Sequence, residues 1–145
     1  MATSLNGADV LLYIKHATYT EDEWKVAVCS IQHTLSETKA ESTVITKCGA
    51  MTAAGTDDNS ISLDLTFLTS APLSGEVAAE TLIEMYRAGA TFEWLIADTF
   101  PSPQYVSDYG NGVMTSCTSS YPAEGMVNVA LEIKCNGVIT GQYTM

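Results

Sequence analysis

The fold is decided by the stretch Ser60-Ile61-Ser62-Leu63-Asp64-Leu65-Thr66-Phe67, in which polar and apolar residues alternate without a break. A period of two is typical of a β-strand that has one buried and one exposed face. We expect the apolar residues to face a core, namely Ile61, Leu63, Leu65 and Phe67. The opposite face is hydrophilic and has no cation, because it consists of Ser60, Ser62, Asp64 and Thr66.

Other strands are predicted on both sides of this one. Residues 91–97 place Phe92, Trp94 and Ile96 on one face. Residues 127–134 alternate again, and their polar face consists of Asn128, Ala130, Glu132 and Lys134. Composition favours further strands over residues 9–14, 24–30, 42–46, 113–120 and 138–145, with Trp24, Val26 and Val28 sharing the half-buried face of the second of these.

A single amphipathic helix is predicted from about residue 74 to residue 88. Ser74 can cap its first N–H groups, and Glu76 complements the positive end of its dipole. Gly89 stands where a left-handed residue commonly ends a helix. The apolar face, which we expect to cover one flank of a sheet, is built by Ala78, Ala79, Leu82, Ile83, Met85 and Tyr86.

Two segments lack a regular pattern and are expected to be long exposed loops. Residues 48–59 are rich in Gly, Ala, Thr and Asp, and residues 99–112 contain two prolines and two glycines. A third break, at Asn136-Gly137, interrupts the last strand pattern. The sequence therefore predicts a single domain over residues 1–145. It is mainly β, α+β by content, with an antiparallel sandwich or rolled sheet flanked by one α-helix.

Charge and apolar patterning exclude some classes of partner. The 145 residues include 17 Asp and Glu but only 6 Lys and Arg, which gives a formal charge of -11. The cations are scattered, so we expect no tight nucleic-acid binding. No apolar run approaches the ~20 residues of a membrane-spanning helix, and the N-terminus lacks the features of a secretory signal. We therefore expect the chain to fold in a cytoplasm, where the reducing environment disfavours disulfides. Buried free thiols are expected at Cys29, Cys48, Cys117 and Cys135.

No residue pattern indicates catalysis or metal binding. His16 and His33 have no patterned nucleophile or acid, and the cysteines form no C-x-x-C pair. Asp57-Asp58-Asn59 lacks the alternating ligands of a calcium loop, and residues 109–112 lack the helix and the lysine of a phosphate loop. We therefore expect a non-enzymatic subunit, without cofactor or metal, that packs against other copies of itself.

The order of elements resembles the major tail-tube proteins of long, non-contractile phage tails and of related gene-transfer particles. The similarity spans nearly the whole chain and rests on patterns of strand, glycine and helix. The matching segments are residues 7–14, 24–32, Thr46-Lys47-Cys48-Gly49, 60–67, 76–94, 112–116 and 127–137. The chain departs from the family at Cys117, at Cys135-Asn136-Gly137 and in the segment 99–112.

The resemblance implies hexameric rings that stack into a virion tail tube, assembled in a host cytoplasm, through which DNA passes transiently. It also implies tape-measure, tail terminator and distal tail proteins as partners. The residues expected to face the channel are Ser60, Ser62, Asp64, Thr66, Asn128 and Glu132. Contacts between subunits are expected in an N-terminal arm at residues 1–8, in both loops and at the C-terminus, including Ala50, Met51, Asp57, Asp58, Tyr105, Tyr109 and Tyr143.

Two alternatives remain open at this point. A tail terminator, or the inner tube of a contractile injection machine, shares the fold and the pattern. A ligand-binding β-sandwich or adhesin module is a different class, in which Trp24, Tyr105 and Tyr109 would form a recognition surface.

Overall fold

The computed structural model describes residues 10–27, 30–67, 75–98 and 106–143. In this part of the chain, eight strands form one sheet in the order β3-β4-β8-β7-β6-β1-β2-β5. All neighbouring strands are antiparallel except β2 and β5, which are parallel. The elements are β1 (Val10–Lys15), β2 (Lys25–Ala27), β3 (Ser30–Thr46), β4 (Gly49–Thr66), β5 (Glu76–Val77), α1 (Ala79–Ala88), β6 (Thr91–Asp98), β7 (Val106–Ser120) and β8 (Asn128–Tyr143). The mainly β fold with one helix is confirmed.

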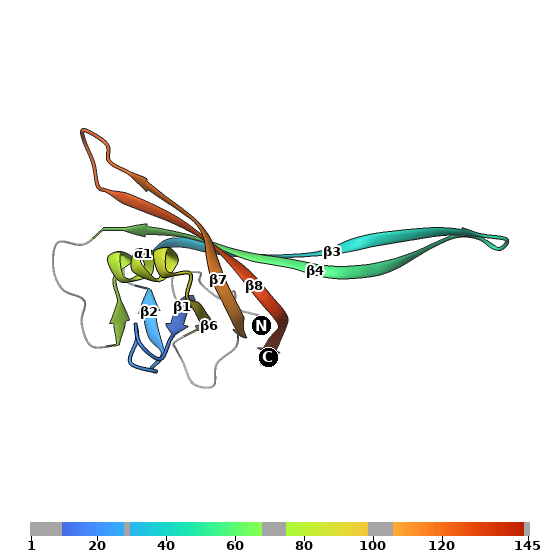
Figure 1. Cartoon of the computed structure of the whole chain (residues 1–145), viewed down its shortest axis with the longest axis horizontal. Coiled ribbons are helices and arrows are strands. Elements are labelled where there is room, and N and C mark those ends of the chain that lie inside the picture. The colour runs from blue at the N-terminus through green and yellow to red at the C-terminus, as the bar shows by residue number, and fades with distance from the viewer. Residues whose placement is uncertain (1–9, 28–29, 68–74, 99–105, 144–145) are drawn as a thin grey trace, which may run out of the picture.

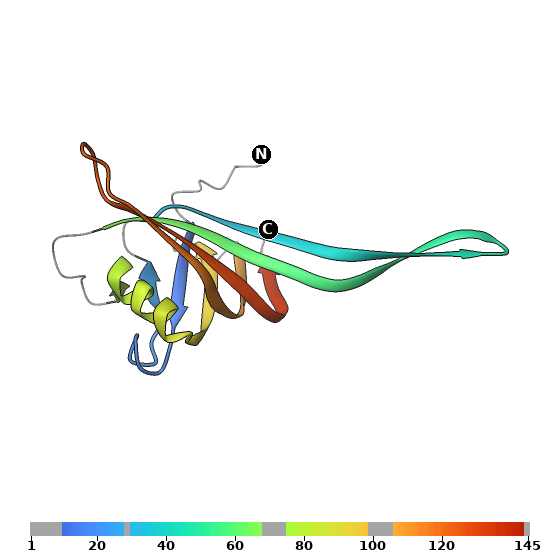
Figure 2. The same cartoon turned by 45° about the horizontal axis from the view of Figure 1, so that its top comes forward.

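The sheet bends so that its inner face and α1 share one core (Figures 1 and 2). The predicted core residues of β4 are fully buried, except for Phe67, which is partly buried just beyond the strand. Burial of each such aliphatic side chain contributes roughly 1.5–3 kcal/mol. The predicted inward faces of β6 and β8 are confirmed as well. The core includes Leu12, Ile14, Leu82, Met85, Phe92, Trp94, Val129, Leu131 and Ile133.

Trp94 lies at the centre of this core and is fully buried. Its indole Nε1 donates a hydrogen bond to the backbone oxygen of Asn111, 3.2 Å away. Gly110 and Gly112 of β7 leave room for the ring, because a Cβ at either position would lie 3.1 or 3.4 Å from a Trp94 atom. Residues 106–112 form the first part of β7. The loop predicted over 99–112 is therefore wrong for these residues. Residues 99–105 lie outside the described part.

The loop predicted over residues 48–59 is also wrong, because residues 49–59 form the first half of β4. This strand pairs with β3 from Ser30 opposite Leu65 to Thr46 opposite Gly49, and the resulting hairpin extends far from the rest of the molecule (Figure 1). At the turn, the Cys48 N–H donates to Thr46 Oγ1 at 3.1 Å, and that hydroxyl donates to the Gly49 oxygen at 2.8 Å. Gly49 has a φ of 110°, which favours glycine.

The helix starts later than predicted. Ala78 occupies the N-cap position, and Glu76 lies in β5, so Glu80 supplies the acidic side chain of the first turn. Ser74, the predicted cap, lies outside the described residues. The end is as expected, since Gly89 has a φ of 65° and closes the helix with its N–H. No helix in the described residues is long and apolar enough to cross a membrane.

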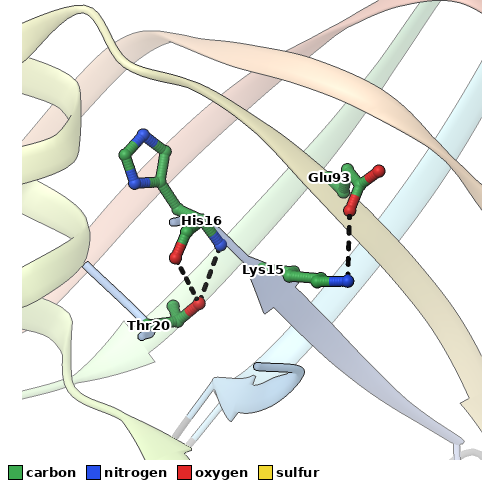
Figure 3. A network of polar contacts seen from close by, with 4 residues as sticks. All are labelled: Lys15, His16, Thr20 and Glu93. Atoms are coloured by element: carbon green, nitrogen blue, oxygen red, sulfur yellow. Dashed lines mark hydrogen bonds and ion pairs between the residues drawn. The ribbon is translucent and has the colours of Figure 1, made fainter. Parts of the chain in front are cut away.

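The face predicted for the strand at residues 24–30 is only partly as expected, since Val26 is half-buried in β2. Ala27 is the buried residue of β2, whereas Trp24 precedes the strand and is 37% exposed. Val28 lies outside the described residues. The Lys15 ammonium lies 5.7 Å from the centre of the Trp24 ring, and it also forms a 3.9 Å ion pair with Glu93 across β1 and β6 (Figure 3). A cation over its ring stabilises Trp24 at this exposed position.

The predicted break at Asn136-Gly137 is a β-bulge within a continuous strand. On β7, Asn111 pairs with Asn136 and Tyr109 pairs with Thr140, so β8 has extra residues between two successive pairs. Gly137 adopts a φ of 75° there, which other residues rarely tolerate. The C-terminal segment therefore continues β8 as far as Tyr143.

Candidate channel face and assembly surfaces

Strands β4 and β8 place the predicted polar residues side by side on one face of the sheet. The register sets Ser62 opposite Glu132, Thr66 opposite Asn128 and Asp64 opposite Ala130. The structure thus brings all six predicted residues onto one continuous surface, opposite the core. Four of them are exposed, namely Ser62, Asp64, Asn128 and Glu132, and the other two, Ser60 and Thr66, are half-buried.

Two more strands, which sequence reasoning did not assign to this surface, extend it on either side. Strand β3 adds Gln32, Thr34, Ser36 and Thr38 beside β4, and β7 adds Ser116, Thr118 and Ser120 beside β8. All seven are exposed. We call this surface, formed by these residues with those of β4 and β8, the polar face. The alternation of hydroxyl residues in both segments was the sequence signal for it, but only strand pairing shows that the segments are neighbours.

The charges on the polar face are mainly negative. Asp64 and Glu132 lie in adjacent strands, and the cation of this face is Lys134. The ammonium of Lys134 forms an ion pair with the carboxylate of Asp58, so its charge is compensated. A surface of this kind has hydroxyl groups and carboxylates but no cluster of cations that could hold phosphate groups.

The base of the β3–β4 hairpin is anchored to the sheet. Asn59 is buried, and its Oδ1 accepts a hydrogen bond from the Thr38 N–H at 3.2 Å. Asp57 forms a 3.4 Å ion pair with Lys39, next to the pair between Asp58 and Lys134. These contacts orient the part of the hairpin beyond them, residues 39–57, which we call the hairpin arm.

The hairpin arm consists of two strands only. Strand β8 pairs with β4 from Ser60 to Thr66, so in the described part of the chain no third strand pairs with the arm. Ile45, close to the turn, is 86% exposed. An isolated two-stranded hairpin is marginally stable in water, and its free edges can pair with another chain. The arm is therefore a surface suited to contact with a neighbour.

The predicted contact residues fall in different places. Ala50, Asp57 and Asp58 are exposed on the arm or at its base, and Tyr109 is exposed on β7. For Met51 and Tyr143 the structure describes the backbone in β4 and β8 but not the side chain, and Tyr105 lies outside the described residues. A further exposed apolar pair, missed by sequence reasoning, is formed by Tyr121 and Met126 at the turn between β7 and β8.

A family model described as phage tail tube protein matches residues 4–141, nearly the whole chain. The chain belongs to the phage tail tube protein family. It is thus a structural component of a virion tail, where it forms the tube. The family is therefore that of tail tube proteins and not of adhesin modules.

Solved structures share the fold of this tail tube protein. The tail of an empty GTA particle with C6 symmetry has a TM-score of 0.71 and 16% identity, over 98% of this chain and 100% of that one. The SPP1 tail tube has a TM-score of 0.76 and 14% identity, over 98% and 81%. The sheath-tube complex of the extracellular contractile injection system PVC has a TM-score of 0.71 and 11% identity, over 97% and 93%. No curated protein matches the sequence significantly.

Of the two histidines of the tail tube protein, His16 lies in a hydrogen-bonded turn and His33 lies half-buried in β3. His16 follows β1, and its Nδ1 accepts hydrogen bonds from the N–H groups of Thr18 and Tyr19 at 3.0 and 3.3 Å. Thr20 Oγ1 accepts from the His16 N–H and donates to the His16 oxygen, which closes the turn (Figure 3). His33 is half-buried, and burial lowers the pKa of its imidazole.

Thiols differ widely in exposure. Cys48, Cys117 and Cys135 are free thiols, of which only Cys135 is buried as predicted; Cys117 is half-buried, and Cys48 is exposed at the tip of the arm. Burial raises the pKa of the Cys135 thiol to about 11, so it stays protonated near neutral pH. Cys29 lies outside the described residues. Within residues 10–27, 30–67, 75–98 and 106–143, no group of three or more His, Cys, Asp or Glu could hold a metal ion.

Proposed function

We propose that this tail tube protein assembles into hexameric rings that stack into a tube, with the polar face lining the channel through which DNA passes. The observation that supports the channel assignment is the continuous polar surface of β3, β4, β8 and β7 on the side of the sheet opposite the core. The C6 symmetry of the similar GTA tail supports six subunits per ring.

The chemistry of the polar face suits the passage of DNA. Duplex DNA carries one negative charge per ~1.7 Å, and proteins hold it by neutralising phosphates with Lys and Arg. Asp64 and Glu132 repel phosphates instead, and Lys134 is already paired with Asp58. DNA can therefore slide along such a wall without being trapped.

Contacts between subunits are assigned to the hairpin arm. At ~3.3 Å per residue, its strands are long enough to reach ~25 Å beyond the sheet, which is the scale of a neighbouring domain. The arm has exposed residues at both ends, with Ala50 near its tip and Asp57 and Asp58 at its base. Assembly in the host cytoplasm, a tape-measure protein inside the tube, and terminator and distal tail proteins at its ends complete the proposed tail.

The channel assignment is tested by reversing the charge of the polar face. In Ser62→Lys with Asp64→Lys, both exposed positions become cationic, so each ring would hold phosphates. We expect normal tubes in electron micrographs but a DNA ejection rate at least roughly tenfold lower, since each added cation strengthens phosphate binding.

A matched control places the same charge change elsewhere. Glu84→Lys with Ala88→Lys alters two exposed positions of α1 by the same total charge. Normal ejection is expected from these particles. Normal ejection from the Ser62 and Asp64 double variant would contradict the assignment of the polar face to the channel wall.

A further inference from the structure

Two Asn-Gly pairs of the sequence lie beside each other in the last two strands. Asn111-Gly112 is in β7, Asn136-Gly137 is in β8, and the register sets Asn111 opposite Asn136. Both asparagine side chains are exposed. Asparagine is chemically labile before glycine, because glycine has no side chain to hinder attack of its backbone nitrogen on the preceding amide. The two pairs therefore share one local chemistry and differ only in their surroundings.

The backbone around an Asn-Gly pair decides whether this attack can occur. To bring the glycine nitrogen to the asparagine Cγ, the peptide group between the two residues must turn out of the extended geometry of a strand. In a ladder, that rotation breaks the hydrogen bonds of the peptide group. A paired strand therefore protects its asparagine until the ladder opens locally.

Asn111-Gly112 is protected in this way. Gly112 is buried, and a Cβ on it would lie 2.8 Å from Ile133 Cγ2 and 3.0 Å from the Lys134 backbone oxygen, so the backbone has no space to turn. The carbonyl of Asn111 belongs to the same peptide group, and its oxygen accepts the 3.2 Å hydrogen bond from the Trp94 indole. Rotation of this peptide would disrupt the core.

Asn136-Gly137 lies at the β-bulge and has the opposite properties. The register sets no described residue of β7 opposite Gly137, because the pair of Asn136 with Asn111 is followed by the pair of Thr140 with Tyr109. Gly137 is exposed, its φ is 75°, and a Cβ on it would meet no described atom within 4 Å. The peptide between Asn136 and Gly137 can therefore turn without disturbing the core.

We propose that Asn136 is a site of spontaneous deamidation, selected over Asn111 by the bulge. The Gly137 nitrogen loses its proton and attacks Cγ of Asn136, the new C–N bond closes a succinimide ring, and the side-chain nitrogen leaves as ammonia. Water then opens the ring at either carbonyl, which leaves aspartate or isoaspartate in place of the asparagine. Water is the only co-reactant, and no atom is oxidised or reduced.

The product adds a negative charge beside the polar face. Cys135 is buried, so the alternation of the strand places Asn136 on the same side of β8 as Glu132 and Lys134. Each converted subunit gains a carboxylate there, in addition to its formal charge of -11. This side of the sheet therefore becomes more negative with the age of the subunit, whether or not it lines a channel.

Peptide mapping of aged protein tests the proposal. Trypsin separates the two sites, because it leaves Asn111 within residues 88–134 and Asn136 within residues 135–145. Folded, unassembled protein is kept in mildly alkaline buffer, and samples are digested at intervals from time zero. Mass spectrometry follows the mass gain that accompanies conversion of an amide to an acid, and fragmentation separates Asn111 from Asn128 in the longer peptide.

We expect Asn136 to convert at least roughly tenfold faster than Asn111, because attack within β7 must wait for local opening of the ladder. The same protein unfolded in guanidinium chloride is the matched control, since it keeps both dipeptides but has neither ladder nor bulge. There the two sites should convert at similar rates. Asn136→Gln keeps an amide at an exposed position but would have to close a larger ring, so its C-terminal peptide should show no mass gain over the same period.

Three results would overturn the proposal. They are equal rates at the two sites in the folded protein, faster conversion at Asn111, and no conversion at Asn136 over a period in which the unfolded protein converts. None of these measurements requires tubes, so their outcome is independent of the proposed function.

Discussion

Gly112 has its place in the fold because of a close approach between strands. A Cβ on Gly112 would lie 2.8 Å from Ile133 Cγ2 and 3.0 Å from the Lys134 backbone oxygen. The backbone oxygen belongs to the β7–β8 ladder and cannot move without breaking that pairing. The side of β7 that faces Trp94 must therefore carry glycine at this position.

A single added methyl group tests this packing. Gly112→Ala is expected to destabilise the subunit by about 1–3 kcal/mol, because it overpacks a filled core. Urea unfolding of unassembled protein gives the change. Asn111→Ala on the same strand is the control: its side chain is exposed and the carbonyl bonded to Trp94 remains, so a change of only about 0.5 kcal/mol is expected. Equal effects of the two substitutions would show that the contact is not tight.

At the scale of elements, the hairpin arm is the feature that most distinguishes the chain from a lone domain. Its base is tied to the sheet through Asn59, Asp57 and Asp58, while its outer part has no third strand in the described residues. Folding of the core does not require the arm, since the buried cluster includes none of its described residues. The arm is therefore available to assembly.

Shortening the arm separates folding from assembly. Thr43 pairs with Thr52, so removing residues 43–52 and joining the strands by Asn-Gly shortens both equally and leaves the remaining register intact. We expect a folded subunit with an unfolding midpoint close to that of the full chain, and no tubes in electron micrographs at any concentration tested. Tubes of normal length from this variant would exclude the arm from the contacts between subunits.

At the scale of the whole molecule, charge opposes assembly. Each subunit carries a formal charge of -11, and the ion pairs of Lys15, Lys39 and Lys134 are all internal to the subunit. Bringing many such subunits into one tube creates repulsion that water and salt must screen.

Ionic strength is therefore expected to control tube formation. Raising salt from about 0.01 M to about 0.15 M shortens the Debye length from about 30 Å to about 8 Å, and so weakens repulsion between neighbouring subunits. The protein concentration at which light scattering begins should fall over this range. A rise instead would mean that attractive ion pairs between subunits, rather than net charge, dominate assembly.

Local pattern was sufficient for residues 60–66 of β4, where apolar and polar residues alternate without a break. Ile61, Leu63 and Leu65 were predicted correctly because a core on one side imposes alternation on the sequence. Gly89 was predicted correctly as the end of the helix for a local reason too, since its left-handed conformation is set by its own φ. The polar residues of β4 and β8 were assigned to one surface on the resemblance, and their register places them there.

Other features depend on residues that are distant in the sequence. The arm was mistaken for a loop because the sequence of residues 49–59 has no apolar period to detect. Residues 106–112 were mistaken for a loop because the glycines that break the local pattern are required by Trp94 of another strand.

The sequence by itself thus determined the alternating core strands, the end of the helix, the negative charge and the family resemblance. Only the tertiary structure decided which strands are neighbours and that β3 and β7 extend the polar face. The physical reason is that strand order and register are set by long-range hydrogen bonds and side-chain packing, whereas periodicity reports only which side of each strand is buried.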